Sequence, residues 1–364
     1  MDIQHLFEPC LLIWINVNIA MNLAVFLLWD KKFHLKWGLQ KYQAIQRIHL
    51  HETPRLGGVI FLICLLGYAF TCDMSDSQNT LKMLAIVTIP AAIVALKEDL
   101  THNVEPAIRL MALLFSGWLF RALYLGAYPD MSAVPVIHDL LLFQGGISFF
   151  YILATVSVAN GMNLIDGVNG LCVAVAFTVL ATLLFLAHMT NDGAMQLTCL
   201  TLILLLLPFT AFNFPLGFIF LGDVGAYVLG ILLSCLSIIF FGRHPELSPW
   251  NAAVALLFPV TEVVFTVLRR LISGQSIYKA DRHHLHLKLF YFLRPRYPFK
   301  KIAGALITPI LAMLWLFPIL SVVVFYHHPS VLIASIFTFW TIYVALYFSL
   351  PKAPNHFDHG DNTP

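Results

Sequence analysis

The chain has 364 residues, of which 59% are hydrophobic and only 11% are charged, and its formal net charge is +2. Soluble domains carry about 25% charged residues, so this composition excludes a water-soluble globular protein. The small net charge also gives no indication of a nucleic-acid partner, and we expect none.

Apolar runs of about 20 residues recur along the chain, and each suffices for a helix that crosses the ~30 Å hydrocarbon core. The sequence therefore predicts an all-α, polytopic integral membrane protein with about 11 spans in one domain, residues 1–351, followed by a disordered polar tail, 352–364. The predicted spans lie near residues 10–29, 57–72, 81–96, 110–127, 140–159, 171–190, 195–212, 225–241, 250–268, 303–325 and 331–350. The first is interpreted as a retained span, because no basic segment precedes it and no small-residue cleavage site follows it.

Lysine and arginine are distributed unevenly between the two sets of predicted loops. If the amino terminus lies outside, 18 of the 21 Lys and Arg residues fall on the inner side, and only Lys82, Arg121 and Arg243 fall on the other. Because short cytoplasmic loops retain positive charge, we expect an outer amino terminus, an inner carboxyl terminus and cytoplasmic basic loops.

The six cysteines are scattered through apolar segments without a Cys-x-x-Cys pair or a metal-type spacing. This pattern favours a role as small packing residues. They are Cys10, Cys64, Cys72, Cys172, Cys199 and Cys235.

The first predicted inner loop is basic and ends in a glycine pair. It contains Arg47, His49 and Arg55 and ends at Gly57 and Gly58. The cations suit a phosphate, and the glycines permit close approach of backbone or ligand. Positive-inside charge and small-residue helix packing explain the same residues equally well.

An acidic pair, Glu98 and Asp99, lies at the inner end of the third predicted span, and Arg109 follows a few residues later. Mg²⁺ takes oxygen ligands from one or two carboxylates plus substrate phosphates, so the pair suits a metal–diphosphate site. A solvated helix cap is the alternative, and for an isolated pair it is the stronger interpretation.

Four polar residues recur every three positions in the next inner segment: Asn160, Asn163, Asp166 and Asn169. A helical or near-helical turn aligns them roughly on one side. Such groups suit a nucleobase, a sugar or a metal-bound water, whereas a plain loop uses the same residue types for turns. The regular spacing favours a binding site.

Two further inner segments carry unusual polar groups. Asp223 is a lone acid in the apolar stretch Phe220–Gly225, where it suits either a helix N-cap or a metal site shared with Asp99 and Asp166. The largest loop, 269–301, contains clustered histidines in basic surroundings without a nearby cysteine, which favours a diphosphate over Zn²⁺ or a plain basic surface. Its central residues are Asp281, Arg282, His283, His284 and His286.

The five motifs occur in order over most of the chain and on one predicted side of the membrane. They are His49–Gly58, Glu98–Asp99, Asn160–Gly170, Phe220–Gly225 and Gly274–His286. Together they resemble the polyprenyl-phosphate N-acetylhexosamine-1-phosphate transferases of glycosyltransferase family 4, especially the branch that uses UDP-N-acetylglucosamine. The resemblance implies that a lipid phosphate attacks the β-phosphorus of a UDP-sugar, giving a lipid-diphosphate sugar and UMP at a cytoplasmic active site.

The resemblance also implies cofactor, partners and residue roles. It implies Mg²⁺, with Mn²⁺ as a substitute, undecaprenyl phosphate, a UDP-N-acetylhexosamine and the bilayer of a bacterial inner membrane, where O-antigen, capsule or exopolysaccharide synthesis begins; a homodimer is left open. The implied catalytic acids are Asp99, Glu98 and Asp166, the metal ligands are Asp99, Asp223 and Glu98, and the substrate-binding residues are His49, Arg109, Asn160, Asn163, Asn169, Phe220, Arg282, His284 and His286.

Three residues depart from the family pattern: Glu98 replaces a usual aspartate, Asn169 replaces a frequent aspartate, and Leu287 replaces a histidine common in the N-acetylglucosamine branch. Two other functions stay open at this point. A transporter or flippase of phosphorylated lipids also explains basic inner loops, but it predicts ionisable residues in mid-span and broken helices. A catalytically inactive membrane scaffold is the third hypothesis.

Overall fold

The computed structural model describes residues 9–28, 53–72, 76–276, 281, 283–296 and 300–351. Within these ranges every regular element is helical, which confirms the all-α prediction. The helices are α1 (Pro9–Leu28), α2 (Gly57–Thr71), α3 (Asp76–Thr101), α4 (Pro106–Leu123), α5 (Pro135–Leu142), α6 (Gly146–Ile165), α7 (Leu171–Met189), α8 (Gly193–Asn213), α9 (Gly222–Arg243), α10 (Trp250–Ala255), α11 (Leu257–Ile272), α12 (Leu285–Leu293), a 3₁₀ turn (Arg294–Arg296), α13 (Lys300–Phe325) and α14 (Pro329–Ser349).

Nine helices in the described ranges are long and apolar enough to cross a membrane, so the predicted count of about 11 is not confirmed. The predicted span 57–72 corresponds to α2, which has only 15 residues. The predicted span 250–268 is broken into α10 and α11 at Leu256. Pro259 explains the break, because it has no N–H to donate to the carbonyl of Ala255.

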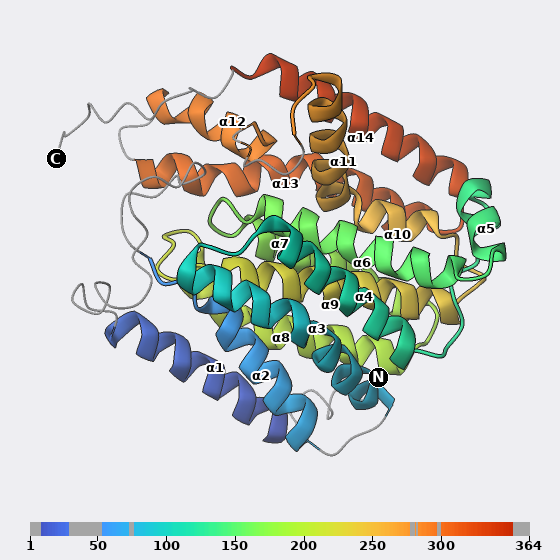
Figure 1. Cartoon of the computed structure of the whole chain (residues 1–364), viewed down its shortest axis with the longest axis horizontal. Helices are drawn as coiled ribbons and strands as arrows, with labels where there is room; N and C mark the ends of the chain where they lie inside the picture. Colours follow the sequence, from blue (N-terminus) through green and yellow to red (C-terminus); the bar gives the residue numbers. More distant parts are fainter. Residues whose placement is uncertain are drawn as a thin grey trace.

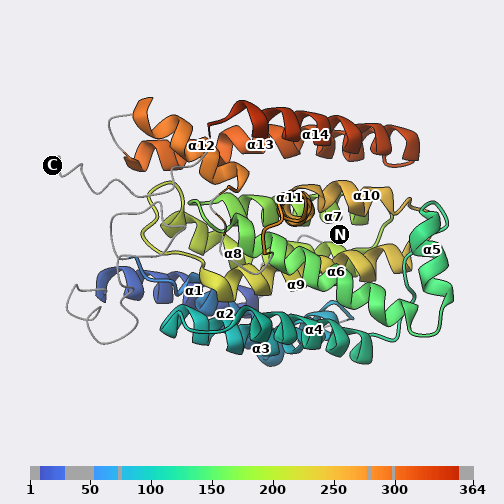
Figure 2. The same cartoon turned by 45° about the horizontal axis from the view of Figure 1, so that its top comes forward.

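The helices form three layers, which are clearest in Figure 2. One outer layer holds α1 to α4, the middle layer holds α6 to α11, and the other outer layer holds α12 to α14. Figure 1 shows α11 running across the direction of most other helices, and Figure 2 shows it nearly end-on. The break at Leu256 therefore redirects the chain before the loop that carries the histidines.

Helix α9 lies in the centre and positions the helices around it. It packs against α2, α3, α6 and α7, and all of its residues are buried except Asp223 and Arg243 near its two ends. A Cβ atom at Gly58 of α2 would lie only 2.3 Å from Gly225 Cα of α9. The close backbone approach predicted for the glycine pair is confirmed at Gly58, where the partner is the backbone of α9, whereas Gly57 packs against the Phe209 ring.

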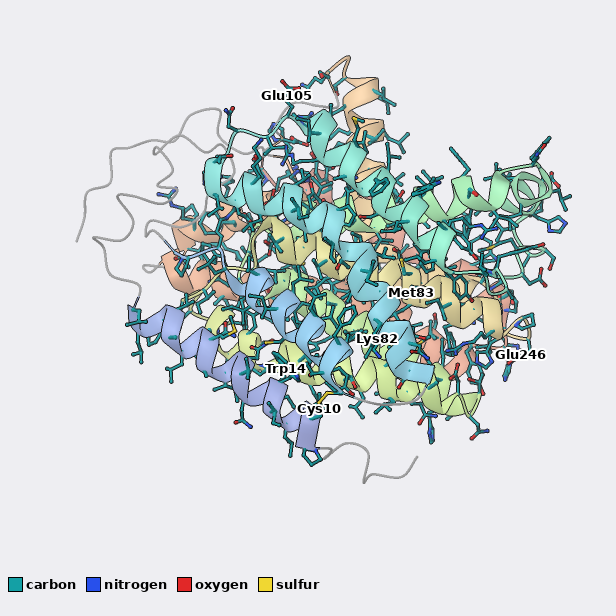
Figure 3. The ribbon with its side chains drawn as sticks, turned by 60° about the horizontal axis from the view of Figure 1, so that its bottom comes forward. Cys10, Trp14, Lys82, Met83, Glu105 and Glu246 are labelled. Carbon is teal, nitrogen blue, oxygen red and sulfur yellow. A yellow bond between two sulfur atoms is a disulfide. The ribbon has the colours of Figure 1, made fainter. Side chains whose placement is uncertain are left out.

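A disulfide joins Cys10, at the start of α1, to Cys72, just after α2. The two helices are antiparallel neighbours, and the Trp14 indole N–H donates to Thr71 Oγ1 at 2.9 Å near the same end. Figure 3 shows this end, with Cys10 and Lys82, opposite the end that carries Glu105. The predicted packing role is therefore wrong for Cys10 and Cys72, since 62 residues of separation gave no spacing signal. The remaining four cysteines are buried and free.

Removal of this disulfide, by Cys10→Ser with Cys72→Ser, is expected to lower the free energy of unfolding by about 2–4 kcal/mol, because the bond closes a long loop in the unfolded chain. Thermal unfolding in detergent, with and without reductant, measures the effect. Reductant should lower the midpoint of the wild type and leave that of the double variant unchanged. Identical midpoints for the oxidised and reduced wild type would contradict the prediction.

Candidate active site

The four predicted acids of the site gather at the amino-terminal end of α9, from three different elements. Glu98 and Asp99 lie in the last turn of α3, Asp166 directly follows α6, and Asp223 lies in the first turn of α9. Since α3 and α6 both pack along α9, their ends on this side meet. The predicted grouping of Asp99, Asp166 and Asp223 on one face is confirmed.

The backbone of α9 binds the Asp99 carboxylate directly and lies beside that of Asp166. The N–H groups of Asp223 and Val224 donate to the two carboxylate oxygens of Asp99, at 3.2 Å and 3.1 Å. The N–H of Gly222 lies close enough to the Asp166 carboxylate to favour its charged form. The first N–H groups of a helix lack intrahelical partners and lie at the positive end of its dipole, so they favour negative charge. Asp99 is only 8% exposed, and the solvated helix cap proposed as its alternative role is wrong.

Glu98 and Asp223 share Arg109 as an ion-pair partner. The Glu98 carboxylate accepts a hydrogen bond from the Val104 N–H at 2.9 Å and lies 3.8 Å from the Arg109 guanidinium. The Asp223 carboxylate lies 3.5 Å from the same guanidinium. The N-cap position of α9 is Leu221, so the alternative role of Asp223 as the capping residue is wrong.

Arg55 completes the cluster, although it was absent from the predicted site residues. Its guanidinium donates to Asp99 at 3.1 Å and lies 3.8 Å from Asp223. Burial lowers the pKa of Arg55, but the surrounding carboxylates, Asp223 and Asp99 foremost, raise it above its ordinary value. The family resemblance implied His49, in the same basic loop, as a substrate-binding residue. His49 lies outside the described residues. The sequence signal for Arg55 was the same basic loop.

The ionisation of Asp166 depends on its surroundings. Burial raises the pKa of Asp166 well above its ordinary value, and the carboxylates of Asp223 and Asp99 act in the same direction, against Arg55. A cation beside this carboxyl would favour its charged form.

The three asparagines of the repeating motif differ in their environment. Asn160 and Asn163 lie on α6, partly buried, and the Asn160 amide donates to the Val156 carbonyl at 3.0 Å. Asn169 is buried, and its amide donates to the Pro215 carbonyl at 3.1 Å. Asn169 thus ties the loop after α6 to the loop before α9, and substrate binding by all three residues stays a prediction.

Phe220 anchors the loop before α9 to the segment before α2. Its N–H donates to the Pro54 carbonyl at 2.8 Å, and its carbonyl accepts from the Gly57 N–H at 3.0 Å. These bonds place Arg55 beside the start of α9. The predicted contact of Phe220 with a nucleotide stays a prediction.

The histidine-containing loop, within residues 269–301, is attached to α11 at Ser276 and at Asp281. Asp281 forms ion pairs with Arg269 and Arg270, and Arg270 also donates to the Ser276 carbonyl at 2.6 Å. Although burial raises the pKa of Asp281, His284, the His283 N–H and the arginines lower it below its ordinary value. Asp281 is therefore ionised at neutral pH and holds the loop against the helix. Arg282 lies outside the described residues.

His284 and His286 are both buried, with nearly parallel rings whose centroids lie 5.7 Å apart. A Cβ atom at Gly167 would lie 2.5 Å from Nε2 of His286, so this ring packs against the loop that begins with Asp166. Burial, and then the proximity of His284, lower the pKa of His286 well below its ordinary value. Leu287, the residue that replaces a third histidine, is also buried.

The composition of the acid cluster fits a divalent cation. Four carboxylates, of Glu98, Asp99, Asp166 and Asp223, face two guanidinium groups, which leaves an excess of two negative charges when all are ionised. In the described part of the chain, no three His, Cys, Asp or Glu side chains are grouped as a preformed metal site. Mg²⁺ needs only one or two carboxylates, because substrate phosphates and water supply its other ligands.

Comparison with known proteins identifies a matching family and several similar proteins. The model of the glycosyl transferase family 4 matches residues 81–241, which contain all four acids. The chain is 24% identical over 268 residues to a probable undecaprenyl-phosphate N-acetylglucosaminyl 1-phosphate transferase of Bacillus subtilis, with 72% of each chain covered. It is 26% identical over 279 residues to a decaprenyl-phosphate N-acetylglucosaminephosphotransferase of Mycobacterium tuberculosis, with 69% of each chain covered.

A third relative is named for a different transferred group. The chain is 25% identical over 272 residues to a phospho-N-acetylmuramoyl-pentapeptide-transferase of Streptococcus pneumoniae, covering 71% of this chain and 82% of the relative. The shared segment in each case spans more than two thirds of both proteins. Residues 81–241 are therefore similar to glycosyl transferase family 4, the family that the loop motifs resemble.

Proposed function

We propose that the protein transfers an N-acetylhexosamine 1-phosphate from a UDP-sugar to undecaprenyl phosphate and releases UMP. The observation that carries this proposal is the set of four carboxylates at the start of α9, three of which form ion pairs with Arg55 and Arg109. Phosphoryl transfer requires positioning and charge neutralisation more than covalent protein chemistry, and such a cluster supplies both. The names of the three relatives support the same reaction class.

In the proposed reaction, an oxygen of the lipid phosphate forms a bond to the β-phosphorus of the UDP-sugar. The bond between this phosphorus and the bridging oxygen breaks, and UMP leaves with that oxygen. A lipid phosphate is already largely ionised at neutral pH, since its second pKa is about 6 by analogy with other phosphate esters. The acids of the site therefore serve mainly to orient cations, and removal of a proton from the nucleophile is a small part of the barrier.

Arg55 and Arg109 are the residues of this chain that orient the acids, because each contacts two carboxylates. Asp223 is the acid best suited to exchange these partners for a metal ion, since its ion pairs are longer than the hydrogen bonds that hold Glu98 and Asp99. Mg²⁺ would be held by Asp223 together with Asp99 or Asp166, and it would neutralise phosphate charge. His284 and His286 are proposed to contact the sugar diphosphate.

In the proposed orientation, the acid cluster lies on the cytoplasmic face of a bacterial inner membrane. Support comes from the excess of Lys and Arg in the loops on that side and from the Cys10–Cys72 disulfide at the opposite end. Structural disulfides persist in oxidising compartments, such as the bacterial periplasm. A UDP-sugar is thus taken from the cytoplasm and the lipid phosphate from the membrane, to begin a cell-surface polysaccharide.

The experiment that tests the proposal measures UMP release by the purified protein in detergent, with undecaprenyl phosphate and Mg²⁺. UDP-N-acetylglucosamine, UDP-N-acetylgalactosamine and UDP-glucose are compared as donors. We expect UMP with an N-acetylated donor only, formation that depends on the lipid phosphate, and loss of at least about 10²-fold in rate with EDTA. Added Mn²⁺ should restore part of the rate.

Three outcomes have distinct meanings for this assay. UMP release that persists in EDTA would contradict the divalent cation, and UMP release with UDP-glucose alone would contradict the sugar class. Folded protein that gives no UMP with any donor would refute the transferase reaction. In that case transport of a labelled lipid phosphate in vesicles would test the flippase hypothesis.

A further inference from the structure

Glu262 is a buried carboxylate on α11 that the sequence motifs did not identify. It is 1% exposed, and its Oε2 atom lies 3.4 Å from Nδ1 of His284, which is 2% exposed. Its other oxygen, Oε1, has no hydrogen-bond partner among the described residues. The Tyr343 phenol of α14 lies beside it. Burying an ionised carboxylate is costly unless a partner compensates its charge. His284 is such a partner for Glu262.

One face of α11 holds Asp281 and His284. Glu262, Thr266, Arg269 and Arg270 are spaced by four, seven and eight residues, which places them on the same side of a helix. Thr266 Oγ1 lies 3.5 Å from Nδ1 of His284. Further along this face, Arg269 and Arg270 bind Asp281. The helix that follows the break at Leu256 thus acts as a rigid support for the loop.

The contacts of His284 define which of its nitrogens is available. Nδ1 lies against Glu262 and Thr266, whereas Nε2 is buried without a hydrogen-bond partner in the described ranges. A carboxylate at one ring nitrogen fixes the proton on that nitrogen and orients the ring. Because His286 stacks on His284 and packs against Gly167, this pair of rings lies next to the loop of Asp166.

We propose that Glu262 is a positioning residue for the transfer reaction: it holds Nδ1 of His284, so that Nε2 is presented to the diphosphate of the sugar donor. This inference rests on the proposed function. Glu262 itself touches no substrate and acts only through His284. The distinction can be tested, because a residue that acts only through a second residue has no effect once the second residue is removed.

The test is a double-mutant cycle of Glu262→Gln and His284→Gln, read as UMP release from a UDP-N-acetylhexosamine with undecaprenyl phosphate and Mg²⁺. Glutamine keeps the shape of Glu262 and removes its charge. We expect Glu262→Gln to lower kcat by about 10-fold to 100-fold, as for partners that orient reacting groups. The KM for the UDP-sugar should change by less than about twofold, because ground-state binding is retained. In the His284→Gln background, Glu262→Gln should add less than about twofold.

The chain offers a matched control in a second histidine–carboxylate pair. His244 Nδ1 lies 2.8 Å from Glu246 Oε1, after the far end of α9. Glu246→Gln should leave both kcat and KM unchanged. A further variant, Thr266→Val, removes the weaker contact to His284 and should lower kcat by about 2-fold to 10-fold, which keeps the inference testable if Glu262→Gln does not fold.

The outcomes separate this inference from the proposed function. Equal fractional losses for Glu262→Gln in the wild-type and His284→Gln backgrounds would overturn the positioning role, and so would wild-type kcat in Glu262→Gln with an unchanged unfolding midpoint. Wild-type protein without UMP release would instead refute the transferase reaction itself. A kcat loss that vanishes in the His284→Gln background supports the role of Glu262.

Discussion

Asp99→Asn is expected to lower the kcat for UMP release by about 10³-fold, the scale observed when a preorganised electrostatic group is removed from an active site. The wild-type carboxylate accepts N–H groups of Asp223 and Val224 and one N–H of Arg55. Asparagine offers one oxygen and turns an NH₂ group toward these donors. One buried donor then loses its acceptor, and Arg55 loses the nearer of its two carboxylate partners.

The expected result includes a moderate loss of stability as well as the loss of rate. An unsatisfied buried donor costs about 1–3 kcal/mol, so the unfolding midpoint should fall while the variant still folds. Asp130→Asn is the control, because Asp130 is exposed and bonds only locally to Ser132 among the described residues. It should leave rate and midpoint unchanged. An Asp99→Asn variant that retains a tenth of the wild-type kcat would contradict the assigned role.

The sequence predicted the acids of the site because each of them lies where an apolar run ends. Glu98, Asp99, Asp166 and Asp223 interrupt hydrophobic segments on one side of the membrane, and helices that cross a bilayer must bring such ends to a common surface. The order of the motifs that contain them, which resembles that of glycosyltransferase family 4, strengthened this prediction. Their grouping could therefore be anticipated without any knowledge of which helices are neighbours.

The partners of these acids could not be anticipated, because they depend on lateral packing. Nothing in the sequence states that α2 meets the start of α9, so the contact of Arg55 with Asp99 and the bonds from the α9 backbone were not predicted. The Cys10–Cys72 disulfide was missed for the same reason. Each depends on two segments that lie far apart along the chain.

Glu262 was missed although a signal was present. It lies inside the predicted span 250–268, and an ionisable residue within an apolar span is itself an indication of function. Pro259, three residues earlier, marks the helix break that redirects this segment. Taken together, the two residues would have predicted that this span is not a simple membrane crossing.

Gly222→Ala is expected to lower kcat by at least about 10²-fold. It displaces Asp99 from its hydrogen bonds to the α9 backbone without removing any charged group. Gly222 has a φ of +76°, which side chains with a Cβ rarely adopt. The added Cβ would also lie 2.7 Å from Asp99 Oδ2 and 3.0 Å from the Arg55 carbonyl oxygen. Both neighbours must move, and the Asp99 hydrogen bonds to α9 lengthen.

Two other glycines separate these effects. Gly145 has a φ of +86° but open space around its Cβ position, so Gly145→Ala carries the backbone strain alone, about 1–2 kcal/mol. Gly304 lies within α13 with a similarly open Cβ position, so Gly304→Ala carries neither effect and should slightly raise stability. UMP release and unfolding midpoints of the three variants are the measurements.

If the collision with Asp99 is decisive, Gly145→Ala lowers the unfolding midpoint and keeps wild-type kcat, whereas Gly222→Ala loses kcat beyond any loss of stability. If Gly222→Ala and Gly145→Ala instead lose activity in proportion to their loss of stability, the hydrogen bonds between Asp99 and the α9 backbone have no special role in the rate. The comparison therefore tests whether the rate depends on how the backbone of α9 holds a carboxylate, which substitution of Asp99 itself cannot resolve.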